Sequence, residues 1–242
     1  MRKENAGGFA WKSLAVLVVL GMARQVRPQY AATPYSKMVP VEQYLMADHG
    51  AEIALARSAA PESIARDAEV MVLGRRGFET AVKGKNGFVC IVGRGWSAAP
   101  DPDFWNAKVR VPMCLNAAAA HTYLLRVTKI TDLALAGHTL AQVNEAMAAG
   151  ISRKELPPME PGAMCYMMSK GGYGGDSTPH WPSHLMFFYS GLASATWGAN
   201  LPGSPVLAVE DTQEQMTSFV VTTPRWSDGT EAMPASAPHV HP

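Results

Sequence analysis

The pattern of hydrophobic and polar positions changes its period several times along this chain. Apolar residues recur at near-helical spacing over 41–60, where Gly50 is expected to break the helix. A capping-box pattern at Thr139 and Gln142 predicts the start of another helix, and Gly150 is its expected end. From these patterns and from good helix formers we expect further helices after Pro61, over 117–130 and over 140–149.

Between the helices the period shifts to that of β-strands. Residues 69–94 hold three short β-type runs separated by turns, and Asn86-Gly87 is a strong signal for a type I′ hairpin. We therefore expect a three-stranded antiparallel meander over 69–94. Further strands are predicted near 163–169, 184–190, 205–209 and 216–222. The fold class that follows is α+β, an antiparallel sheet packed against several helices.

The first residues have the layout of a secretory signal peptide. Arg2, Lys3 and Lys12 precede an apolar run over 13–23, which ends in small residues. A membrane span needs about 20 apolar residues, so this run is too short to be one. We expect a periplasmic or secreted protein divided into a signal peptide (1–23), a linker (24–40), a single α+β domain (41–226) and a disordered tail (227–242).

Composition and charge exclude several classes of function. The 242 residues are 48% hydrophobic and 17% charged, with a net charge of +1. Cleavage of the signal would remove three basic residues and one acidic residue, which leaves a net charge of −1. A nucleic-acid partner is not expected, because binding it requires a basic surface. No later apolar run is long enough for a membrane span after cleavage.

Three cysteines leave the redox chemistry open. An oxidising compartment permits one disulfide among Cys90, Cys114 and Cys165, and sequence cannot say which pair would form it. Cys90 lies in a run of apolar residues, and we favour a role as a small buried hydrophobe for Cys90 and for Cys165.

The candidate chemistry is concentrated in one segment. A glycine-rich stretch at 171–175 would let the backbone approach a ligand closely, and aromatic and imidazole side chains follow it. The candidate ligand-binding residues are Tyr173, Asp176, His180, Trp181 and His184. Asp176, His180 and His184 are also candidate ligands for a metal ion, Zn or Cu.

Local geometry limits this metal hypothesis. Pro182 lies between His180 and His184 and disfavours a helix there. In an extended chain the two histidines would lie about 13 Å apart, so only a turn could bring them to one ion. Copper would suit a segment rich in Met, Cys and His, whereas the alternative is that its methionines fill a core. These methionines are Met164, Met167, Met168 and Met186.

Two functional hypotheses remain. The first is an exported, non-catalytic domain that binds a small molecule or a protein. It is favoured because the sequence has no nucleophile or metalloprotease motif. The alternative is an exported hydrolase, either metal-dependent or based on a cysteine and a histidine of the 165–184 segment. Convergence of these side chains in one pocket would distinguish the two.

Overall fold

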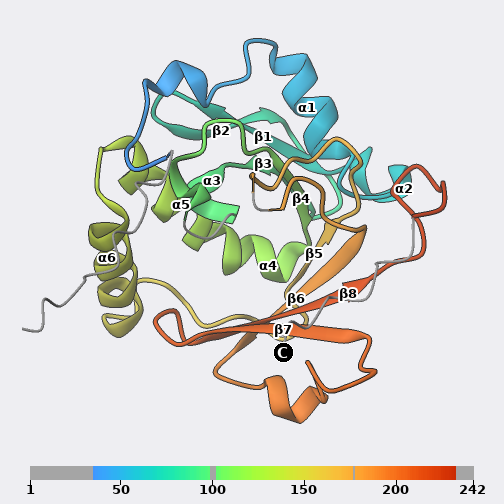
Figure 1. Cartoon of the computed structure of the whole chain (residues 1–242). Helices are drawn as coiled ribbons and strands as arrows, with labels where there is room; N and C mark the ends of the chain where they lie inside the picture. Colours follow the sequence, from blue (N-terminus) through green and yellow to red (C-terminus); the bar gives the residue numbers. More distant parts are fainter. Residues whose placement is uncertain (1–34, 99–101, 177, 233–242) are drawn as a thin grey trace, which may run out of the picture. The chain divides into compact units, whose positions relative to one another are not determined.

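The computed structural model describes residues 35–98, 102–176 and 178–232. The predicted signal peptide lies outside the described residues. The fold is α+β, as expected, and its centre is one eight-stranded sheet (Figure 1). In order across the sheet, the strands are β2 (Gly77–Val82), β1 (Glu69–Gly74), β3 (Val89–Gly93), β4 (Val111–Leu115), β5 (Met164–Met167), β6 (His184–Ser190), β8 (Met216–Thr222) and β7 (Val206–Asp211).

Helices cover both faces of this sheet. They are α1 (His49–Arg57), α2 (Glu62–Ala65), α3 (Gly95–Ala98), α4 (Ala117–His121), α5 (Tyr123–Leu135) and α6 (Leu140–Ser152), with short 3-10 turns at η1 (Val41–Gln43), η2 (Asp103–Trp105) and η3 (Ser194–Trp197). Along β3 the side chains alternate between the two layers. Cys90 and Val92 pack beneath α1, whereas Ile91 packs with Val127 of α5 on the other face.

The predicted meander is wrong in its third strand. The β1–β2 hairpin forms, but β3 pairs with β1 in parallel, with Val70 opposite Cys90. The chain therefore crosses the start of β1 before β3 begins. Gly84 makes this crossing possible, because a Cβ atom there would lie 2.2 Å from the backbone nitrogen of Glu69. The Asn86 side chain accepts from Phe88 N at 3.1 Å, so Asn-Gly forms a local turn instead of a hairpin.

The helix boundaries also differ from expectation. The region 41–60 holds only η1 and α1, and Gly50 lies in the first turn of α1, behind an Asp48 cap. The region 117–130 is divided between α4 and α5. The capping box of α6 is confirmed, but Gly150 is inside the helix. The left-handed position after that helix belongs to Lys154, whose φ is 59°.

One disulfide joins neighbouring strands. Cys90 of β3 and Cys114 of β4 face each other in the antiparallel register and are bonded. Cys90 is buried as expected, but as half of a disulfide. Cys165 is a buried free thiol, as the sequence indicated.

The described ends of the chain pack against the domain. Tyr35, Met38 and Val39, which belong to the predicted linker, contact an apolar cluster around Trp96 and Trp105. The structure describes 227–232 of the predicted tail, where Ser227 N donates to Met168 O at 3.0 Å. Residues 24–34 of the predicted linker and 233–242 of the predicted tail lie outside the described part.

A buried ion pair ties the first helix to the sheet. Arg94 and Glu52 are both fully buried, with Nη2 and Oε1 2.8 Å apart. Arg94 also donates to Tyr44 O and Val92 O, and Glu52 accepts from Leu73 N at 3.2 Å. The ion pair and its hydrogen bonds together connect η1, α1, β1 and β3.

We expect Glu52→Gln to destabilise the fold strongly, because it leaves the Arg94 cation buried without a counter-charge. A loss of about 3–5 kcal/mol in the free energy of unfolding is typical of such changes. Urea denaturation followed by circular dichroism measures it. The control is Glu42→Gln, which breaks an exposed pair with Arg75 and should leave the stability unchanged. Equal losses in the two variants would contradict the role of the buried pair.

Candidate functional site

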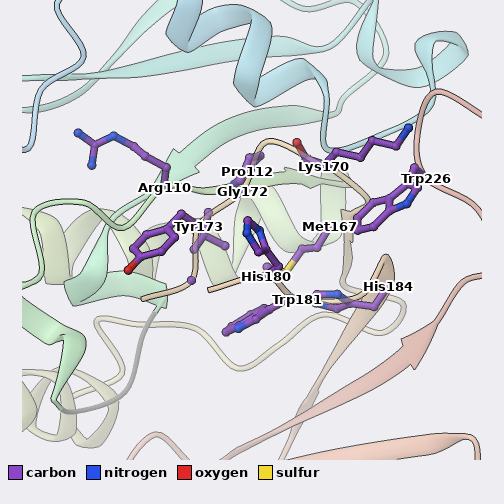
Figure 2. A pocket seen from close by; sticks show the side chains of 13 residues that line it. Arg110, Pro112, Met167, Lys170, Gly172, Tyr173, His180, Trp181, His184 and Trp226 are labelled. Carbon is purple, nitrogen blue, oxygen red and sulfur yellow. The ribbon is translucent and has the colours of Figure 1, made fainter. Parts of the chain in front are cut away.

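An open pocket lies where the glycine-rich segment after β5 meets the first residue of β6. It holds about 390 Å³ of empty space, of which about 40 Å³ admits the centre of a water molecule. Figure 2 shows the side chains that line it. Those used below are Met167, Lys170, Tyr173, His180, Trp181, His184 and Trp226. Four of the five predicted binding residues are thus brought together in one pocket.

The glycines of this segment fit close contacts with its surroundings. Tyr173 exchanges two backbone hydrogen bonds with Arg110, of 2.7 and 2.9 Å, which fix the segment beside β4. A Cβ atom on Gly174 would lie 2.7 Å from Trp181 Nε1, and one on Gly175 would lie 2.5 Å from the Asp103 carboxylate. Gly175 also has a φ of 125°, which other residues rarely adopt. The stretch is therefore a packed wall of the pocket.

Asp176 has a different role from the one expected. It does not line the pocket, and its carboxylate accepts from the hydroxyl of Tyr173 and, at 2.6 Å, from that of Tyr35. The two hydrogen bonds lower the pKa of Asp176, and the bond from Tyr173 has the larger effect. The same contact raises the pKa of Tyr35 to about 12. Asp176 thus fastens the segment before η1 to the wall of the pocket.

His184 is the most clearly defined polar group of the pocket. Its Nδ1 lies 2.7 Å from Pro182 O, and because a carbonyl can only accept, Nδ1 carries the hydrogen. Burial lowers the pKa of His184, so the ring is neutral at pH 7. No described residue bonds to Nε2, which keeps its lone pair. The Trp181 ring lies beside it, with centroids 5.7 Å apart. His180, by contrast, is exposed to solvent.

The predicted zinc-type ligands do not converge. Within 35–98, 102–176 and 178–232, no group of three or more His, Cys, Asp or Glu side chains is placed to hold a metal ion. Asp176 is engaged by two tyrosines, while His180 is exposed and His184 is buried. Asp176, His180 and His184 are therefore not placed to bind one metal ion together.

A second cavity lies behind the pocket. It holds about 290 Å³ of empty space and is lined by Met113, Tyr123, Cys165, Met167, Trp181, Met186 and Phe188. Met167 and Trp181 line both spaces, so they separate one from the other. The Cys165 thiol belongs to this second cavity, and burial raises its pKa to about 12. It is therefore not placed as an activated nucleophile for the pocket.

Sequence reasoning missed two of the functional candidates. Trp226 reaches the pocket from the turn after β8, and Met113 reaches the second cavity from β4. Both are distant in sequence from 165–184, and no local pattern marks them. Only the strand order of the sheet could have placed them there.

Comparison with known proteins adds no assignment. The sequence matches no protein-family model, and neither the curated proteins nor the solved structures give a match. Among the described residues, no helix has both the length and the apolar character needed to cross a membrane.

We expect the neutral His184 to make the fold sensitive to acid. The pKa of His184 is lower in the folded chain than the ordinary 6.5. Below pH 6.5 the imidazole is therefore protonated in the unfolded chain but stays neutral in the folded chain. Stability is thus lost as the pH falls through 6.5 towards the folded pKa. Urea denaturation at pH 7.5 and pH 5.0 should show a smaller acid loss for His184→Gln than for the unchanged protein. His180→Gln is the control and should keep the full acid loss; the same loss in both variants would refute the assignment.

Proposed function

We propose that this chain is an exported, non-catalytic binding domain whose pocket takes a small uncharged ring compound with hydroxyl groups, such as a single sugar unit. The observation that carries the proposal is the neutral His184, which lines the same pocket as Trp181 and Trp226 and whose Nε2 has no hydrogen-bond partner among the described residues. Binding pockets typically combine apolar and aromatic walls with a few polar groups that orient the ligand.

The charges around the pocket favour an uncharged ligand. Lys170 is paired with Asp228, with Nζ and Oδ2 2.8 Å apart. The Arg110 guanidinium donates to the backbone oxygens of Ala107 and Val109, and Figure 2 shows it directed away from His180. Neither cation is free to bind an anionic group in the centre of the pocket. A charged ligand would gain little here to offset the loss of its hydration.

The polar and aromatic groups favour a hydroxylated ring. A neutral imidazole with hydrogen on Nδ1 can only accept at Nε2, so the ligand must supply a donor such as a hydroxyl. Trp181 and Trp226 line the pocket, and indole rings can offer flat apolar surface to the less polar side of a sugar ring. The small space that admits the centre of a water molecule, about 40 Å³, suits no more than one ring, bound with one edge open to solvent.

The hydroxyl groups nearby support binding over hydrolysis. Ser169 Oγ lies 2.6 Å from Ser58 Oγ and accepts from Gly171 N at 3.1 Å, so its hydrogen bonds serve the loop. It has no imidazole partner among the described residues, which a nucleophilic serine requires. Export is supported by the signal pattern over 1–23 and by the Cys90–Cys114 disulfide, a bond typical of oxidising compartments.

Titration calorimetry with neutral monosaccharides tests this proposal. The panel is glucose, galactose and N-acetylglucosamine, with glucuronate as the charged comparison, on the chain from residue 24 onward. We expect one neutral sugar to bind with saturation and to be preferred over glucuronate. His184→Leu removes the acceptor and should weaken binding roughly fivefold, the equivalent of one hydrogen bond of about 1 kcal/mol.

Two further variants complete the experiment. Trp226→Leu should weaken binding by a similar factor, because it removes one aromatic face. His121→Gln changes an exposed histidine that does not line the pocket and should leave the affinity unchanged. Tighter binding of glucuronate, or no sugar binding at millimolar concentration, would overturn the proposal.

A further inference from the structure

The register of three strands places four sulfur-containing side chains on one face of the sheet. Cys165 of β5 lies opposite Met186 of β6, and opposite Leu115 of β4 on its other side. Met167 and Met113 are each two residues along their strands, so they continue the same face in the next row. Directly opposed side chains in antiparallel strands have Cβ atoms about 5 Å apart. The three methionines and Cys165 therefore occupy neighbouring positions on this face of the sheet.

These side chains surround a space instead of filling it. Met113, Cys165, Met167 and Met186 all line the second cavity, where about 50 Å³ admits the centre of a water molecule. The remaining walls are the rings of Tyr123, Trp181 and Phe188. Protein interiors are close-packed, and methionine is the side chain that most readily closes an irregular gap. Three methionines around an open cavity are not explained by gap filling alone.

The ligand atoms of this cavity are soft. Thiolate binds zinc as well as monovalent copper, but structural zinc sites are completed by further thiolates or imidazoles. One thiolate among thioethers is a softer ligand set, which suits monovalent copper. Among the described residues, no histidine, aspartate or glutamate lines the cavity. The three rotatable bonds of each methionine allow its sulfur to turn towards an ion without a change in the backbone.

We propose that this cavity is a monovalent copper site, with Cys165, Met167 and Met186 as ligands and Met113 next to them. The ion replaces the thiol proton of Cys165, which leaves to solvent, and copper remains monovalent, so no electron is transferred. Movement of Met167 and Trp181, which line both spaces, provides the route from the pocket. The proposal does not depend on the sugar ligand proposed above.

Competition with bicinchoninate, a coloured chelator of monovalent copper, tests the site. The full chain is titrated without oxygen in the presence of ascorbate. We expect one copper ion per chain to be withdrawn from the chelator, and X-ray absorption should show sulfur alone around the metal. Cys165→Ala, which removes the thiolate, should weaken binding at least 100-fold. The double variant Met167→Leu/Met186→Leu should weaken it at least tenfold while keeping the core volume.

Two controls separate the site from general effects. Met147→Leu replaces a methionine buried in another cluster and should leave the copper affinity unchanged. His239→Ala/His241→Ala removes the only His-x-His of the sequence and should also have no effect. Circular dichroism and urea denaturation establish that each variant is folded. The proposal is overturned if no copper is withdrawn, if nitrogen surrounds the metal, or if folded Cys165→Ala binds copper as tightly as the unchanged protein.

Discussion

The arrangement of this domain depends on one fully buried ion pair. A buried charge is stable only when a partner and hydrogen bonds replace its hydration, which restricts where the surrounding backbone can lie. Arg94 meets that requirement with Glu52 of α1 and with the carbonyls of Tyr44 and Val92. The other half of the pair, Glu52, reaches β1 through Leu73 N. Helix α1 thus has one position on the sheet, which apolar packing alone would not define as sharply.

The position of α1 also affects the pocket, because the residues at the C-terminal end of this helix contact the loop after β5. Ala59 O, just beyond α1, accepts from Met168 N at 2.9 Å, and Ser58 Oγ lies 2.6 Å from Ser169 Oγ. Ser58 O also accepts from Ser227 Oγ at 2.6 Å, in the turn that carries Trp226. Two segments that line the pocket are therefore hydrogen-bonded to the C-terminal end of the same helix. The ion pair does not line the pocket, but it fixes the helix that positions these two segments.

The sequence predicts features that are set locally and misses those set by long-range contacts. Strand β6 and the capping box of α6 were predicted correctly, because alternation and cap chemistry act within a few residues. The parallel β3 was missed because its position depends on Gly84 passing the start of β1, which no local pattern shows. The site divides in the same way. Tyr173, His180, Trp181 and His184 are close in sequence and line one pocket, whereas Asp176 does not line it and Trp226 comes from a remote turn.

Trp181 connects the two proposed sites. Its indole lines both the pocket and the sulfur-lined cavity, and Gly174 leaves the room that its Nε1 edge requires. A ligand that shifts the ring on one side necessarily changes the wall of the other space. Linkage requires that any such effect on affinity be equal in both directions. The two proposed ligands, one hydroxylated and one a soft cation, would therefore influence each other's binding through a wall that Trp181 shares with Met167.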